Sequence, residues 1–534
     1  MSDTLICAGG SSLRVLEAAL HLCAAGLGPP KLKVMVIDPD KANGNFTRVK
    51  GLLDKYVECQ QAFGGRLGEG VNLFGTELDL LDTEGAERGV KIWTPVQPNE
   101  ALKDLLNYDL LDTTATKRDV CHLFFTADEL KEKLGQGFRG HPAIGAAALS
   151  LVSLYAKNPP WAQLVAKMRN ELGGKDGCRV FLVGSVFGGT GASAIHPVAR
   201  FLRSIPEGAA VERLKIGVAA MVPYFQFVPA PAAPGVPVVD DGHKLAAKSE
   251  WFALATRAAA EFYQHLREND DWPFDSVYWI GDSGAMEVPY HPGGPAQKNP
   301  GHFVDLLGAL ACLEFFSFPD ERFGKAVGCS CAGPRQDVVP PSRGKNLLDW
   351  LDVPLLHFKR RDLFDSLVGF FLAGAVHLGF GMPLMTHEKG EIDRRPYCVP
   401  WYLERFLRGA SIRSGDELGK LELLSQFFRT YHFPWWAQVL GPQRVSEVRL
   451  FNRFVLRPGE ADTVDVDLDH LANILWPNLG DAAKKDPFDD FFTDMVRVPK
   501  RKAGQEGVPN YLSLLARAAR LYTQREYHNE TPED

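Results

Sequence analysis

Along residues 1–320, short runs of apolar residues alternate with longer segments in which apolar residues recur three and four positions apart. Residues 5–8 and 34–37 are two such runs, and residues 13–25 between them have helical spacing. Further strands are expected at residues 180–183, 214–222 and 275–280, and further helices at residues 142–155, 251–266 and 299–316. This alternation predicts an α/β fold, a doubly wound and mostly parallel sheet with helices on both faces.

The pattern changes after residues 333–344, a stretch rich in turn-forming residues that includes Pro340-Pro341. Beyond it the chain is aromatic and mostly helical in pattern, apart from a strictly alternating strand at residues 463–469. We therefore expect two domains, an α/β domain at residues 1–330 and a largely helical domain at residues 331–534. Aromatic pairs such as Trp435-Trp436 indicate a core or a surface for a protein partner, with the core favoured.

Glycine-rich turns follow two of the apolar runs and precede helical segments. Gly9-Gly10-Ser11-Ser12 follows the first run, and residues 187–193 stand between the run at 180–183 and a helix at 194–202. Glycine lets the backbone approach an oxyanion closely, and a helix start offers free N–H groups and a positive dipole end. Both turns therefore predict phosphate binding, at the edge of the sheet where ligands of such folds bind.

Two common phosphate-binding motifs fit less well. A Walker P-loop is excluded because none of the Gly-Lys pairs in the chain is followed by serine or threonine. A dinucleotide fingerprint is half present, since Asp38 ends the second strand, but the first turn does not read G-x-G-x-x-G. An oxidoreductase that uses NAD or FAD on a Rossmann-type fold therefore stays open as an alternative.

Residues 184–197 read Gly-Ser-Val-Phe-Gly-Gly-Thr-Gly-Ala-Ser-Ala-Ile-His-Pro. This segment resembles the G-G-G-T-G-[ST]-G signature of the tubulin/FtsZ superfamily, in a divergent bacterial-type form, with Phe187 in place of the first glycine and Ala192-Ser193 in place of the last pair. Other segments occur in the order of that family: the first glycine turn, the polar turn with Asp38 and Asn43, residues 139–145 and the helix from Asn299. The resemblance covers about residues 1–325.

The resemblance implies a site for GTP or GDP, with Mg²⁺ as a further cofactor. The turn at Arg139-Gly140-His141 would face the terminal phosphate, and Asn299 and Phe303 would contact the base. The implied nucleotide-binding residues are Gly9, Gly10, Ser11, Ser12, Asp38, Arg139, Gly140, His141, Gly188, Gly189, Thr190, Gly191, Ala192, Ser193, Asn299 and Phe303.

The resemblance also implies self-association into dimers or filaments. In the family, an acidic residue on the loop after the long helix completes the nucleotide site of the neighbouring subunit and positions the attacking water. Asp320 and Glu321 hold that place here, although the N-x-D motif of the family is absent. Nucleotide binding is thus better supported than GTPase activity, and a non-polymerising nucleotide-binding switch or interaction module is a second alternative.

Composition bears on the partners and the cellular location of the protein and leaves the predicted fold unchanged. The chain has 534 residues, 45% of them apolar, and its net charge of −7 argues against nucleic-acid binding. Nine scattered cysteines do not form a disulfide framework, and no secretory signal is visible at the first residue positions. The apolar stretch at residues 367–384 is interpreted as a buried helix rather than a membrane span. We therefore expect a cytoplasmic protein.

Overall fold

We describe the protein from a computed structural model. The described residues are 2–65, 67–68, 70–81, 92–96, 99–111, 116–138, 140–151, 160–174, 177–228, 249–282, 286–291, 293–324, 328–332, 346–348, 350, 360–381, 415–441, 446–467, 474 and 507–527.

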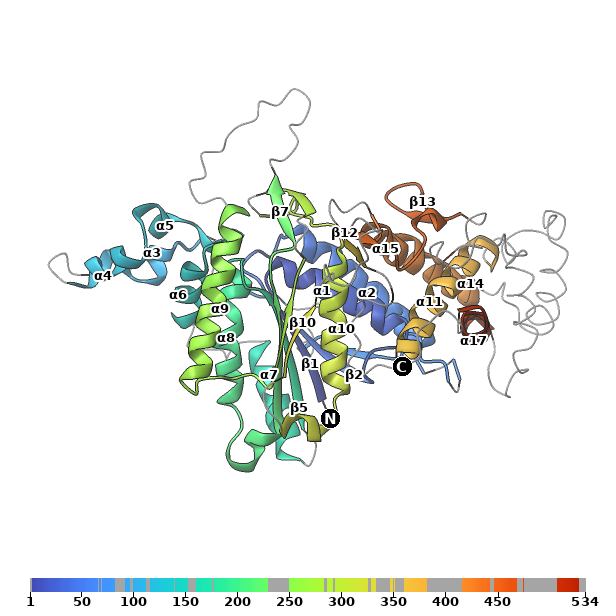
Figure 1. Cartoon of the computed structure of the whole chain (residues 1–534), viewed down its shortest axis with the longest axis horizontal. Coiled ribbons are helices and arrows are strands. Elements are labelled where there is room, and N and C mark those ends of the chain that lie inside the picture. The colour runs from blue at the N-terminus through green and yellow to red at the C-terminus, as the bar shows by residue number, and fades with distance from the viewer. Residues whose placement is uncertain are drawn as a thin grey trace, which may run out of the picture.

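A parallel sheet forms the centre of the described structure (Figure 1). Its strands are β1 (Ser2–Ala8), β2 (Lys31–Ile37), β3 (Glu77–Asp79), β4 (Ile92–Trp93), β5 (Cys178–Ser185), β6 (Leu214–Met221), β8 (Ser276–Ile280) and β10 (Gly328–Ala332). Their order is β10-β8-β6-β5-β1-β2-β3, and β4 also pairs with β2. Ala8 at the end of β1 is level with Ile37 of β2 and Gly184 of β5. The loops that follow these three strands therefore leave the sheet at the same edge.

Helices cover both faces of the sheet, as the sequence pattern predicts (Figure 1). One face packs against α1 (Gly10–Ala24), α2 (Gly44–Phe63) and α10 (Phe303–Ser317), and the other against α7 (Trp161–Gly173), α8 (Thr190–Arg203) and α9 (Phe252–Glu268). Successive strand residues point to opposite faces. Leu5 and Cys7 accordingly join the first core cluster, while Ile6 and Ala8 join the second. The predicted α/β fold with a doubly wound sheet is confirmed.

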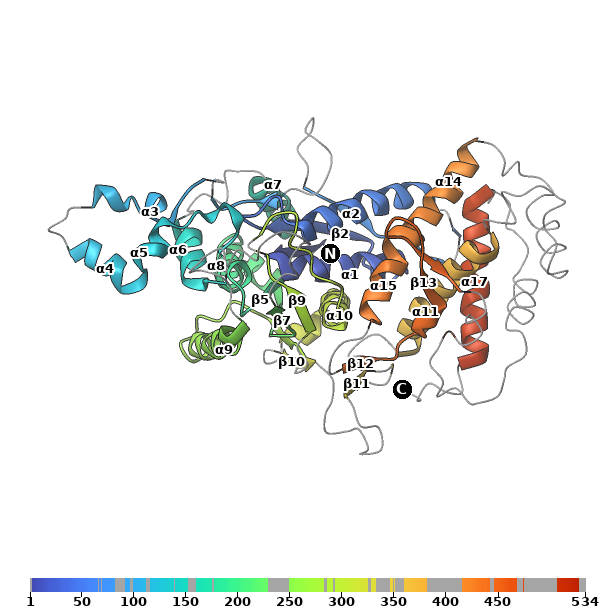
Figure 2. The same cartoon turned by 90° about the horizontal axis from the view of Figure 1, so that it is seen from above.

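Between β4 and β5 the chain forms a helical unit that projects from the body (Figure 2). It contains α3 (Leu102–Leu105), α4 (Thr116–Phe124) and α5 (Ala127–Lys131), and it leads into α6 (Pro142–Leu151), which packs against α8. The unit has a small core of its own, which includes Leu102, Leu130 and Phe138. The sequence pattern predicts α6, expected at residues 142–155, but contains no prediction for α3, α4 and α5.

The part of the chain after residue 346 is mainly helical where it is described, which confirms the second half of the fold prediction. Its helices are α11 (Arg360–Val376), α14 (Gly415–Gln426), α15 (Phe433–Val439) and α17 (Gly507–Tyr527). Short strands pair β11 (Asn346–Leu348) with β12 (Ser446–Val448), and β13 (Leu456–Pro458) with β14 (Val464–Val466). One cluster of buried side chains runs from α1, α2 and α10 into these helices. The boundary at residue 330 stays a prediction.

The aromatic residues of this C-terminal part belong to the core. Phe427, Phe428, Trp435 and Trp436 are all fully buried. Among the described helices, one window, Asp362–Gly379, is long and apolar enough to cross a membrane, and 83% of it is buried inside the protein. Such burial is typical of a core helix.

Candidate functional site

The two glycine turns lie side by side at the carboxyl edge of the sheet. Gly9 precedes α1 with a φ of 82° and a ψ of 169°, and Gly189 precedes α8. Neither helix start has a side-chain cap, so the first N–H groups of both helices lack that partner. A Cβ atom on Gly9 would lie 3.2 Å from the Cβ of Thr190 and 3.3 Å from the backbone N of Gly191. The contact between the turns thus depends on glycine.

A cavity opens where the turns meet. Its volume is about 160 Å³, or about 840 Å³ with the open space at its mouth. Ten of the residues predicted from the sequence line it: Gly9, Gly10, Ser11, Asp38, Gly140, Gly188, Gly189, Thr190, Gly191 and Asn299. None of the described lining residues is lysine or arginine. An anion here would therefore be held by backbone N–H groups, hydroxyls and helix dipoles.

Three further predicted residues of the turns do not line the cavity. Ser12 donates its hydroxyl to the carbonyl of Gly9 at 2.6 Å, and Ser193 donates to the carbonyl of Gly189 at 2.8 Å. Both hydroxyls are therefore used inside the first turn of their own helix. Ala192 lies on α8 outside the lining.

Of the residues predicted to face the terminal phosphate from the loop before α6, one lines the cavity. Gly140 lines the cavity with a φ of 77°, and the side chain of Phe138 packs beside Gly189. The imidazole of His141 lies outside the lining, 3.2 Å from the carboxylate of Glu129. Arg139 lies outside the described residues.

Carboxylates and side-chain amides form the wall beside the first turn. Asp38 accepts a hydrogen bond from the backbone N–H of Asp40 at 3.0 Å, and Asp40 accepts one from the N–H of Gly294 at 2.6 Å. Burial raises the pKa of Asp38 to about 7, the hydrogen bond from Asp40 lowers it, and the charge of Asp40 raises it. Asp38 can thus exchange a proton or bind a cation near neutral pH.

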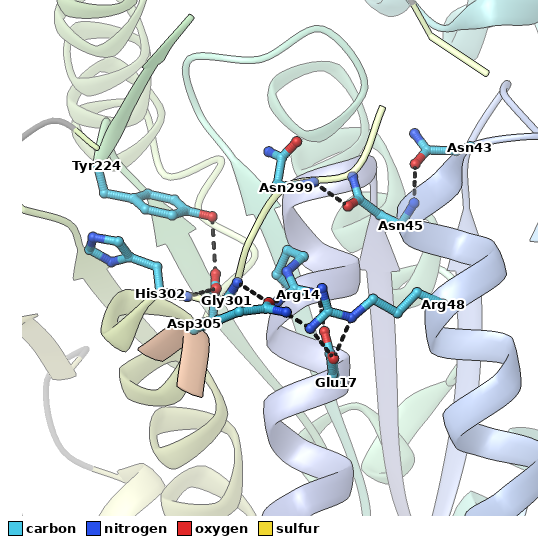
Figure 3. Close-up of polar contacts among 11 residues, drawn as sticks. Arg14, Glu17, Asn43, Asn45, Arg48, Tyr224, Asn299, Gly301, His302 and Asp305 are labelled. Atoms are coloured by element: carbon cyan, nitrogen blue, oxygen red, sulfur yellow. Dashed lines mark hydrogen bonds and ion pairs between the residues drawn. The ribbon is translucent and has the colours of Figure 1, made fainter. Parts of the chain in front are cut away.

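Three asparagines extend this wall toward the start of α10 (Figure 3). Asn43 caps α2 by accepting from the N–H of Asn45 at 2.9 Å, and Asn45 accepts from the N–H of Asn299 at 2.8 Å. The side chain of Gln297 donates to Asn299 at 2.5 Å. Amides offer both donors and acceptors, as the polar edge of a base requires. Asn45 was missed in the sequence, although it lies two residues after Asn43, which the resemblance places with Asp38 in one short polar turn.

An aromatic wall lies opposite and was also missed. Phe225, Phe227, Phe252 and Tyr290 line the cavity together with Phe187. Ring centroids of Phe187 and Phe252 are 4.7 Å apart, and those of Phe227 and Tyr290 are 5.3 Å apart. The wall is built on a separate parallel pair, β7 (Phe225–Val228) with β9 (Met286–Pro289). An apolar wall of aromatic rings is suited to stacking against the ring of a ligand.

The predicted base contact Phe303 and the predicted catalytic acid Asp320 lie away from the cavity. Phe303 is fully buried in the core at the first position of α10. Helix α10 begins there because His302 caps it, accepting from the N–H of Val304 at 3.2 Å. Asp320 follows the far end of α10 and pairs with Arg179, near the start of β5, at 2.9 Å. Glu321 lies in the same turn, and its side chain is outside the described residues.

A second polar network lies behind the asparagines (Figure 3). Glu17 of α1 is shared by the buried Arg14 and by Arg48 of α2, whose Nε donates to it at 2.8 Å. The side-chain oxygen of Gln438 accepts from Arg48 at 2.7 Å and from the N–H of Gly301 at 2.8 Å. The C-terminal part of the chain thus holds the segment that carries Asn299.

On the other side of that segment, Asp305 accepts from the hydroxyl of Tyr224 at 3.0 Å and from the N–H of His302 at 2.8 Å. Burial raises the pKa of Asp305 to about 7, against the lowering effect of Arg14. Tyr224 immediately precedes β7, so this network also fixes the start of the aromatic wall.

The fold and the cavity define an α/β protein with a ligand pocket at the carboxyl edge of a parallel sheet. Residues 154–237 match a family model described as tubulin like. The resemblance predicted from the sequence is confirmed for this segment, which contains β5, the second glycine turn and α8.

Among solved structures, the chain is similar to CetZ2 from Haloferax volcanii, determined as a GTPγS-bound protofilament. The match has 12% sequence identity and a TM-score of 0.25, and it covers 59% of this chain and 56% of CetZ2. The chain thus matches little more than half the length of that protein. No curated protein sequence shows a significant match to this chain.

Proposed function

We propose that this protein binds a guanine nucleotide, GTP or GDP, in the cavity between α1 and α8. The observation that carries the proposal is the contact between the two uncapped helix starts, where Gly9 and Thr190 meet. Two helix N-termini that point into one cavity supply converging N–H groups and two positive dipole ends. The tubulin-like match of residues 154–237 supports a guanine nucleotide over other phosphate ligands.

The remaining walls would hold the rest of the nucleotide. The asparagine wall supplies donors and acceptors for the base or ribose, and the aromatic wall supplies a stacking surface. Mg²⁺ takes few protein carboxylates together with phosphate oxygens and water, and Asp38 is the carboxylate we assign to it. The described residues include no group of three or more histidine, cysteine or acidic side chains arranged for a metal. The ion would therefore depend on the nucleotide.

We further propose head-to-tail self-association, with Asp320 acting in the pocket of the neighbouring molecule. Asp320 lies by the start of β5 and the cavity lies by its end. A strand of eight residues spans about 26 Å, so Asp320 cannot reach the pocket of its own chain. A head-to-tail contact would bring Asp320 of one molecule to the cavity of the next. The pair would still have one unoccupied cavity and one unoccupied Asp320 surface, so the contact can repeat. The cysteines whose side chains the structure describes, at 7, 23, 59, 121, 178 and 312, are all free, which supports a reducing, cytoplasmic setting.

Direct binding measurements test the nucleotide proposal. We expect the purified protein to release GTP or GDP on denaturation and to bind a fluorescent GTP analogue that GTP displaces better than ATP or NAD. Light scattering and sedimentation with GTP should then report assembly. Binding of GTP without assembly at any concentration would favour the non-polymerising switch. Binding of NAD or FAD without binding of GTP would favour the oxidoreductase and refute our proposal.

A mixing experiment tests the role of Asp320. The Asp320→Ala variant keeps an intact pocket, and the Gly9→Ala variant keeps an intact Asp320, so each alone should hydrolyse GTP slowly. In an equal mixture, about a quarter of random head-to-tail contacts would join an intact pocket to an intact Asp320 and recover activity. Asp271→Ala is the matched control, because Asp271 is also an exposed acid paired with an arginine, Arg200 at 3.3 Å. A mixture no faster than its two components would contradict catalysis between neighbours.

A further inference from the structure

A second cavity lies between the α/β part and the C-terminal part of the chain. Its volume is about 860 Å³, within the range of roughly 300–1,000 Å³ that small-molecule sites occupy. One wall comes from α1, α2 and Lys298, and the other from residues 430–441 and 453–464. We call this cavity the interdomain cleft. Lys298 lines it and the next residue, Asn299, lines the nucleotide pocket, so the two sites are neighbours.

The lining of the interdomain cleft has an excess of positive charge. Its cations are Arg48, Lys298, Arg453 and Arg457. It has two carboxylates, Glu17 and Asp462, and Glu17 is already shared between Arg48 and the buried Arg14. In the described part of the chain, no acidic side chain pairs with Lys298, Arg453 or Arg457. This excess contrasts with the net charge of −7 for the whole chain.

The cations come from both walls and from separate elements. Arg48 lies on α2 and Lys298 in the segment before α10, while Arg453 lies in a short 3-10 turn and Arg457 on β13. Burial lowers the pKa of Arg48, which means that its charge is poorly solvated, and the charge of Glu17 opposes that shift. Cations held on opposite sides of a concave surface focus their field into it and attract multiply charged anions.

We propose that the interdomain cleft binds a small polyanion, a molecule that carries at least two phosphate or carboxylate groups. Two groups are needed because Arg453 and Arg457 line one wall and Arg48 and Lys298 the other. Thr430 adds a hydroxyl donor to the lining and Gln438 adds an amide, whereas the hydroxyls of Thr47 and Thr463 already donate to backbone carbonyls. The site does not depend on the nucleotide proposal, since its residues differ from those that line the nucleotide pocket.

Calorimetric titration of the full chain tests this site. The probes are inorganic triphosphate and citrate, in Mg²⁺-free buffer of low ionic strength and without GTP, because GTP is itself a polyanion and would compete for the cleft. We expect at least one probe to bind and the binding to weaken steeply as salt is added. The double variant Arg453→Ser/Arg457→Ser should lose about tenfold in affinity for that probe and keep its affinity for GTP. A preference for triphosphate would identify a phosphorylated ligand, and a preference for citrate a polycarboxylate.

The matched control removes two exposed arginines elsewhere. Arg257→Ser/Arg267→Ser changes the same charge on α9, outside the interdomain cleft, and should leave probe affinity unchanged. Failure of both probes to bind at low ionic strength would overturn the proposal, and so would equal probe affinity in the cleft variant and the wild type. If GTP does not bind, these titrations still decide the cleft, because Gly9→Ala should keep probe binding and Arg453→Ser/Arg457→Ser should lose it.

Discussion

Gly9→Ala is the sharpest test of the nucleotide pocket. Gly9 has a φ of 82° and a ψ of 169°, a backbone conformation that is essentially confined to glycine and costs other residues about 1–3 kcal/mol. The new Cβ would also press on the Cβ of Thr190 at 3.2 Å and on the backbone N of Gly191 at 3.3 Å. Relief of this contact must move the start of α1 away from the start of α8.

Two quantities should therefore change together. The free energy of unfolding should fall by about 1–3 kcal/mol, measured by denaturant titration of the protein without nucleotide. Affinity for GTP should fall about tenfold or more, because the N–H groups of the two helix starts no longer converge on one phosphate group. A fluorescent GTP analogue, titrated well below the unfolding transition, measures the second effect separately from the first.

Gly419→Ala is the matched control. Gly419 lies within α14, its φ is not positive, and a Cβ there would meet no atom within 4 Å. This substitution should raise the free energy of unfolding by up to about 1 kcal/mol and leave GTP affinity unchanged. A folded Gly9→Ala variant that binds GTP within twofold of the wild type would refute our assignment of the phosphate site.

Three further predictions follow from buried or shared polar groups. With Mg²⁺ present, GTP affinity should rise between pH 6 and pH 8, since Asp38, whose pKa burial raises to about 7, must lose its proton to bind the ion; Asp38→Asn should abolish this rise, and an unchanged pH profile would count against Asp38 as a ligand. Gln438→Ala should weaken GTP binding severalfold by freeing the N–H of Gly301, whereas Gln264→Ala on the outer face of α9 should not; equal affinities would show that the C-terminal part does not position Asn299. Burial lowers the pKa of His377 to about 3, so below about pH 6.5 the unfolded chain takes up a proton that the folded protein does not. The free energy of unfolding therefore decreases as the pH is lowered in that range. Between pH 7.5 and pH 5, the free energy of unfolding measured by denaturant titration should fall by about 2 kcal/mol more in the wild type than in His377→Asn. Equal decreases in the two proteins would refute this prediction.

The sequence could predict the elements whose signal is local. Apolar runs, helical spacing and glycine turns gave the parallel sheet, its covering helices and the two turns that meet at Gly9 and Thr190. Because β1, β2 and β5 are parallel, the loops that follow them leave the sheet at the same edge, and the register confirms this.

The rest of the pocket depends on contacts between distant segments. Phe227 and Tyr290 form one wall only because β7 pairs with β9, and neither short strand has a periodic pattern long enough to predict that pair. The same holds for Gln438, which reaches Gly301 across 137 positions of sequence. Ser12 and Ser193, in contrast, depend only on local contacts. A serine three or four residues after a helix cap can donate its hydroxyl to the cap carbonyl, and both serines do so.

The distance between Asp320 and the pocket makes the concentration dependence of GTP hydrolysis decisive. Within one molecule, the acids among the described lining residues are Asp38 and Asp40, and both carboxylate oxygens of Asp40 already accept backbone hydrogen bonds. Asp38 is assigned to Mg²⁺ and cannot at the same time be free to activate water. A single molecule therefore lacks an acid for hydrolysis in the described part of its pocket, whereas a head-to-tail pair has Asp320. The rate per molecule should accordingly rise with protein concentration until assembly is complete. A rate that is independent of concentration and unaffected by Asp320→Ala would place the reactive groups inside one chain and rule out catalysis between neighbours.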